Sequence, residues 1–137
     1  MPSSLKSLRI INCEGLECFP ARGLSTPTLT SFNLACENLK SLPHQMRDLK
    51  SLRDLTISFC PGVESFPEDD MVSFPDEECL LPISLTSLII TEMESLAYLS
   101  LQNLISLQSL DVTTCPNLRS LGSMPAHLKN LNLLVLY

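Results

Sequence analysis

The segment LKSLRIINC, residues 5–13, places apolar side chains at Leu5, Leu8 and Ile10 and a cysteine at Cys13. The same frame returns as LRDLTISFC at residues 52–60, as LQSLDVTTC at residues 107–115 and, with a final methionine, as LTSLIITEM at residues 85–93. A spacing of three and then two residues does not follow one stripe of a helix, whereas the Leu8 to Ile10 step has the period of a strand. The frame therefore predicts one short strand per repeat, with alternate side chains turned inward.

The repeat length sets the architecture. Frames begin at Leu5, Leu29, Leu52, Leu85, Leu107 and Leu128, which lie 24, 23, 33, 22 and 21 residues apart. All but one of these intervals fall in the range of roughly 20–29 residues that is typical of leucine-rich repeats. One coil cannot bury its own apolar edge, so neighbouring coils must stack. We predict an α/β leucine-rich repeat solenoid over residues 1–137: a short curved arc of about six repeats, with a parallel β-sheet on the concave face and irregular or short helical arms on the convex face.

Three departures from the frame lead to further expectations. The second repeat has lost one residue from its turn, because Cys36 follows Leu34 by two positions whereas Cys13 follows Ile10 by three. The sixth repeat is incomplete, which suggests a truncation, a variant reading frame or a fragment. Two return arms show a spacing of three that favours short helical turns, at Met46, Leu49 and Leu52 and at Leu101, Leu104 and Leu107.

Charge is sparse and unevenly placed. Only 18% of the residues are charged, and the net charge is −6. Six acids gather in the one long interval: Glu68, Asp69, Asp70, Asp76, Glu77 and Glu78. We expect an acidic insert over residues 68–82, which is either a solvated loop or a surface that attracts a basic partner. Nucleic-acid binding is not expected, because the chain has no basic stripe and no tryptophan, and the acidic stretch would repel phosphate.

The remaining signals favour a cytoplasmic chain without a membrane span. No apolar run reaches the roughly 18 residues that a spanning helix needs, the first residues lack the layout of a signal peptide, and no N-glycosylation acceptor occurs. We therefore expect reduced cysteines. Cys13, Cys36, Cys60 and Cys115 share one position of the frame, which predicts free, inward-facing structural thiols; Cys18 and Cys79 lie off that position.

No residue pattern predicts catalysis, a metal site or a cofactor. The cysteines lack a metal-ligand spacing, His44 and His127 are remote from any nucleophile or paired carboxylate, and no phosphate-binding glycine loop exists. What remains is the concave sheet, whose outward positions are expected to form one exposed row that binds protein. The predicted binding residues are Arg9, Asn33, Asp54, Thr56, Phe59, Ile89, Glu92, Asp111 and Thr114.

Three phrases carry a family resemblance: LKSLPHQM at residues 39–46, LRDLTISFCP at residues 52–61 and LQSLDVTTCPNLRSL at residues 107–121. The chain resembles the C-terminal repeats of plant nucleotide-binding leucine-rich-repeat disease-resistance proteins of the coiled-coil class. That resemblance implies intracellular sensing of a pathogen effector or a guarded host protein, and contact with the receptor's own nucleotide-binding domain. The nucleotide-switch and N-terminal signalling domains of that family have no counterpart in this sequence.

The sequence therefore favours a non-enzymatic recognition module: the terminal repeat segment of a plant immune receptor. One alternative is a free-standing small repeat protein that acts as a scaffold or a decoy. Another is an enzyme-inhibiting repeat protein. An enzyme would require a convergent acid, base or nucleophile set, and the sequence offers none.

Overall fold

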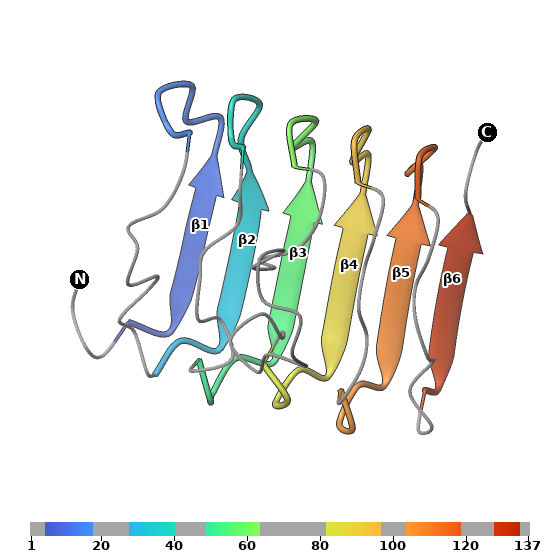
Figure 1. Cartoon of the computed structure of the whole chain (residues 1–137). Helices are drawn as coiled ribbons and strands as arrows, with labels where there is room; N and C mark the ends of the chain where they lie inside the picture. Colours follow the sequence, from blue (N-terminus) through green and yellow to red (C-terminus); the bar gives the residue numbers. More distant parts are fainter. Residues whose placement is uncertain are drawn as a thin grey trace, which may run out of the picture.

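The computed structural model describes residues 5–17, 28–40, 49–63, 82–96, 104–118 and 128–134. Within these ranges the chain forms six strands of five residues: β1 (Ser7–Ile11), β2 (Ser31–Ala35), β3 (Asp54–Ser58), β4 (Ser87–Thr91), β5 (Ser109–Thr113) and β6 (Asn130–Leu134). All pairings are parallel, and the order across the sheet is the order along the chain (Figure 1). The molecule is thus a β-solenoid in which each frame supplies one strand, as the repeat predicts.

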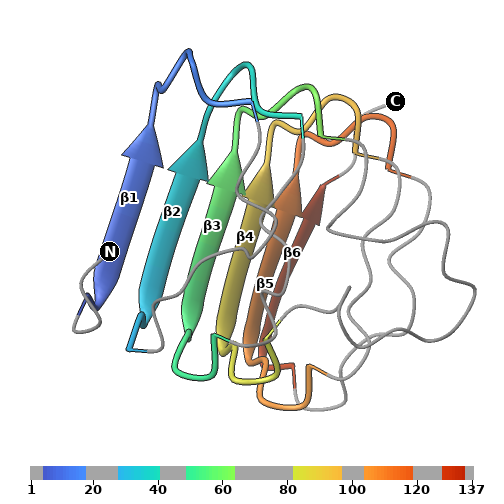
Figure 2. The ribbon, with the colours of Figure 1, turned by 60° about the vertical axis from the view of Figure 1, so that its left-hand side comes forward.

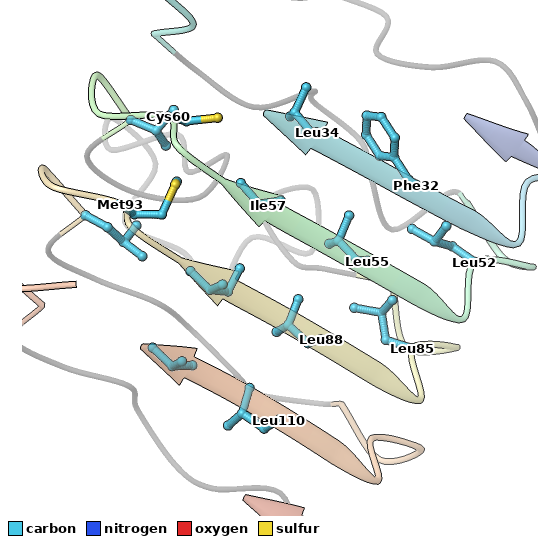
Figure 3. Close-up of a cluster of buried hydrophobic side chains, with 14 of the residues drawn as sticks. Phe32, Leu34, Leu52, Leu55, Ile57, Cys60, Leu85, Leu88, Met93 and Leu110 are labelled. Atoms are coloured by element: carbon cyan, nitrogen blue, oxygen red, sulfur yellow. The ribbon is translucent and has the colours of Figure 1, made fainter. Parts of the chain in front are cut away.

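Each strand buries alternate side chains. In β3, Leu55 and Ile57 are buried while Asp54, Thr56 and Ser58 are exposed or half-buried, and β4 and β5 repeat the alternation. The inward side chains stack from coil to coil into one core, in which Phe32, Leu55, Leu88 and Leu110 occupy the same register position (Figure 3). Fully burying a side chain of this size stabilises the fold by about 1.5–3 kcal/mol relative to leaving it exposed.

The turn after each strand is also repeated. The amide of the apolar residue three positions after the frame cysteine donates to the cysteine carbonyl, as in Leu16 to Cys13 at 3.1 Å and Leu118 to Cys115 at 3.1 Å. The frame position itself is filled by Cys36, Cys60, Met93 and Cys115, all fully buried. The predicted role of these cysteines is therefore confirmed, except that Cys13 in the first coil is exposed.

The expected helical arms are not found in the described residues, which contain no helix. Where the spacing predicted helical turns, Leu49–Leu52 and Leu104–Leu107 each form a single turn, closed by an amide that donates to the carbonyl three residues earlier, at 3.1 Å and 3.2 Å. Leucines three residues apart can both face the core when a single turn joins them, just as they can on a helix. The spacing therefore fits either structure. The α/β expectation is wrong for these segments. Residues 41–48 and 97–103 and the acidic insert, apart from Pro82, lie outside the described residues.

Candidate functional site

One face of the sheet is turned away from the core, and we call it the open face (Figure 2). Register places five of the predicted binding residues in a single row across it: Arg9, Asn33, Thr56, Ile89 and Asp111. Adjacent strands lie about 4.8 Å apart, so the row extends for about 19 Å. The register thus aligns these five residues, of which Arg9 is exposed and the other four are half-buried.

Asp54 lies on the same face but outside that row. It pairs in register with Ser31 of β2 and Ser87 of β4, one row closer to the N-terminal ends of the strands. The row on the other side contains Ser58, Thr91 and Thr113, and the Thr113 hydroxyl donates to Thr91 Oγ1 at 3.0 Å.

Asp111 is the most unusual member of the row. Its Oδ1 atom is buried and has no hydrogen-bond partner in the described part of the chain. Leaving a buried acceptor unpaired costs about 1–3 kcal/mol, and more when the group is charged. A donor from a second molecule laid on the open face would satisfy this oxygen and recover that free energy.

The other three predicted residues, Phe59, Glu92 and Thr114, lie where β3, β4 and β5 end. Together with residues from the following turns they line a pocket of about 440 Å³, which we call the acidic groove. Its charged residues are all acids, namely Glu37, Glu92 and Glu94. Apolar surface comes from Phe59, which is 53% exposed, and from two prolines of the turns. The groove therefore combines a negative field with an exposed aromatic ring, a combination that attracts lysine or arginine.

Backbone strain is concentrated at this groove. Among the described residues, the non-glycine residues with positive φ are Asn12 (58°), Phe59 (53°), Glu92 (55°) and Thr114 (53°), and all four line it. With positive φ, the chain turns at these residues without losing hydrogen bonds between coils. The amides of Asn12, Phe59 and Glu92 still donate to carbonyls of the next coil, at 2.8, 3.3 and 3.2 Å. The second coil has no such residue, which follows from the residue missing from its turn.

The groove residues that sequence reasoning missed include Glu37, Pro61, Glu94 and Pro116. A signal for them was present, because each directly follows the frame cysteine or methionine, and the stacking of coils must bring that position together. The same turns are joined by side-chain amides, since Asn38 donates to the Glu14 carbonyl at 2.8 Å and Asn117 donates to the Glu94 carbonyl at 2.6 Å.

The stacked thiols are suited to packing and not to nucleophilic chemistry. Burial raises the pKa of the Cys36, Cys60 and Cys115 thiols, which disfavours the reactive thiolate. Cys60 and Cys115 direct their sulfur atoms to the carbonyls of Ser58 and Thr113, each at 3.3 Å. Within the described ranges no group of three histidine, cysteine or acidic side chains is placed to hold a metal ion.

Comparison with protein-family models, with curated proteins and with solved structures gives no match to this chain. None of the residues that the structure describes belongs to a helix with the length and apolarity required to cross a membrane.

Proposed function

We propose that the chain is a non-enzymatic protein-recognition module of the leucine-rich repeat type, which binds a partner protein across its open face and acidic groove. The observation that carries this proposal is the unpaired, buried Oδ1 of Asp111, at the β5 end of an otherwise regular row. The unpaired Oδ1 atom costs free energy in the isolated chain, and a ligand that donates a hydrogen bond to it on the open face would recover that free energy.

The acidic groove supports the same proposal from a second side. Phe59 exposes 53% of its surface beside Glu92, and both hold strained backbone conformations. Strained residues cluster at ligand clamps, because a binding surface must hold side chains where unstrained geometry would not place them. Aromatic and charged side chains around a pocket are also the usual anchors of protein interfaces.

The family assignment rests on the sequence resemblance. We propose that the module is the terminal repeat segment of a cytoplasmic plant immune receptor, and that its partner is a pathogen effector or a guarded host protein. In the full receptor, the same repeats would contact the nucleotide-binding domain. A free-standing scaffold or decoy, or an enzyme-inhibiting repeat protein, would use the same face, and the gene sequence on both sides of residues 1–137 distinguishes the first of these alternatives from the receptor.

The proposal is tested by comparing matched surface variants. Immobilised wild type, Phe59→Ala and Asp111→Ala are used to capture proteins from a plant cell extract, with Ile83→Ala as the control because Ile83 is 55% exposed in a turn away from the groove. We expect at least one protein to lose about tenfold or more of its recovery with both site variants and to keep it with the control. Calorimetry with that purified protein should reproduce the ranking.

Circular dichroism must show that all variants remain folded. If every captured protein is retained equally by the site variants and by Ile83→Ala, the open face and the groove are not the binding surface, and the proposal fails.

A further inference from the structure

The opposite ends of the strands carry a second ordered row of polar side chains. The residue just before each of the strands β2 to β6 donates its amide to the carbonyl of the corresponding residue in the preceding coil, with nitrogen to oxygen distances of 2.7–2.9 Å. This row, which we call the basic rim, consists of Lys6, Thr30, Arg53, Thr86, Gln108 and Lys129. It runs along the N-terminal ends of the arrows in Figure 1, whereas the acidic groove lies at their C-terminal ends.

The rim borders a pocket of about 700 Å³. The turns that precede β3, β4 and β5 supply its other wall, with Lys50, Ser51, Ser84 and Ser106 among the lining residues. All of the charged lining residues are cations, namely Lys50, Arg53 and Lys129, and each is exposed. Asp54, the acid that follows Arg53 in the sequence, is not part of the lining.

These cations have no acidic partner in the described part of the chain. The ion pair found there joins Lys40 to Glu17 at 3.4 Å, away from the pocket. The hydroxyls of Thr30, Ser84 and Thr86 already donate to carbonyls of the preceding coil, at 3.0, 2.6 and 3.2 Å. Apart from the exposed Ile105 side chain, the groups left to face a ligand are therefore two ammonium groups, a guanidinium group, the Gln108 amide and the hydroxyls of Ser51 and Ser106.

The spacing of the cations selects the shape of the ligand. The backbones of Arg53 and Lys129 are separated by three steps of the ladder, which correspond to about 14 Å. An extended peptide rises about 3.3 Å per residue, so side chains four residues apart are separated by about 13 Å. Lys50 lies in the turn just before Arg53, so the end at the third coil presents two positive charges and the end at the sixth coil presents one.

We propose that the basic rim is a binding site for an extended acidic segment of a partner protein, with two anionic side chains four residues apart. The anion that meets Lys50 and Arg53 is best matched by a dianionic group such as phosphoserine, and the anion that meets Lys129 by a carboxylate. This site is separate from the open face and the groove, so it holds or fails independently of the function proposed above.

The experiment is a fluorescence-anisotropy titration of the full chain with short labelled peptides at low salt. One peptide carries two glutamates four residues apart, one replaces both with glutamine, one spaces the glutamates two apart, and one has phosphoserine in place of the first glutamate. We expect the glutamate peptide with spacing four to bind at least about fivefold more tightly than the two-apart peptide, the phosphoserine peptide to bind most tightly, and the glutamine peptide not to bind. Salt should weaken every interaction.

Substitutions in the protein test whether the peptide binds at the basic rim. Arg53→Gln and Lys129→Gln should each lower the affinity of the glutamate peptide about fivefold, and Arg53→Gln should reduce the advantage of the phosphoserine peptide. Lys6→Gln, on the same rim outside the pocket, and Lys40→Gln, at the other ends of the strands, should change nothing. Binding that is absent, independent of spacing or equally sensitive to all four substitutions would overturn the proposal, because it would reflect diffuse attraction and not a built site.

Discussion

Gly62 lies against the backbone of Leu39 in the preceding coil: a Cβ atom at Gly62 would stand 2.9 Å from the Leu39 carbonyl oxygen. Asn38 and Asn117 occupy the corresponding turn position in the second and fifth coils and carry full side chains there. The third coil is the one that stacks on the shortened turn of the second repeat.

Gly62→Ala should therefore lower the free energy of unfolding by about 1–3 kcal/mol, because a carbonyl held in the coil-to-coil stack cannot move aside cheaply. The matched control is Gly15→Ala at the same turn position of the first coil, where a Cβ would meet nothing within 4 Å. That change should be neutral or slightly stabilising. Urea unfolding of the two variants checks the pair, and equal effects would show that the close approach is absent.

The strained turn position can be relieved by substitution. Thr114 holds φ at 53° with a β-branched side chain, whereas the first coil has Asn12 at the same position with φ of 58°. Asparagine tolerates this region far better than threonine. Thr114→Asn should raise the free energy of unfolding by about 1 kcal/mol, and the reverse change Asn12→Thr should lower it by a similar amount. Thermal melts that move both variants in the same direction would contradict this reading of the turn.

Asp111→Asn should stabilise the isolated chain by about 1 kcal/mol, because it removes a charge whose Oδ1 atom is buried without a partner. Asp54→Asn is the control, since Asp54 is exposed on the same face and should respond little. Chemical denaturation measures both changes. A destabilised Asp111→Asn would mean that the carboxylate serves the fold itself, which would remove the main support for a ligand on the open face.

The rates at which the cysteine thiols are alkylated should follow their burial. Cys13 is exposed while Cys36, Cys60 and Cys115 are buried, so an alkylating reagent should modify Cys13 more than about a hundredfold faster than the other three. Peptide-level mass spectrometry at successive times resolves the sites. Rapid labelling of Cys60 in the folded chain would show that the coils open far more readily than their packing implies.

The same thiols predict a pH dependence. Burial raises the pKa of Cys36, Cys60 and Cys115, so the unfolded chain releases these protons at a lower pH than the folded chain does. With respect to these groups, the free energy of unfolding should be constant below the ordinary thiol pKa of about 8.5 and should fall as the pH rises above it. Urea unfolding between about pH 7.5 and about pH 9.5 measures the slope, which Cys60→Ala should reduce. A slope of zero in wild type would contradict the prediction.

The frame was sufficient to predict the sheet, because its chemistry is local. The apolar frame positions face inward from coil to coil, and a one-residue error in register would move Leu55 and Ile57 to the open face. The missing residue near Cys36 was equally visible in the sequence. The helical arms were predicted wrongly because a spacing of three fits one turn as well as several, and the described segments Leu49–Leu52 and Leu104–Leu107 each form a single turn.

The candidate sites were predicted less completely, because charge was counted along the chain and not by position in the frame. Arg53 and Lys129 are 76 residues apart in the sequence, yet both directly follow a frame leucine and therefore lie on one rim. Glu37 and Glu94 each directly follow the frame cysteine or methionine and therefore both lie in the acidic groove. The strain at Phe59 and Thr114 has no sequence signal, since neither residue type favours positive φ.

Because strand order follows chain order, a change in the number of coils has a simple geometric result. Deleting residues 52–84, one frame interval of 33 residues, would place the frame leucine Leu85 directly after Ser51 and set β4 beside β2 in an unchanged register. Both rims and the open-face row would shorten together by one strand spacing, about 4.8 Å, with the other coils intact. Gain or loss of whole coils thus changes the length of the open face along the stacking direction in increments of one strand spacing.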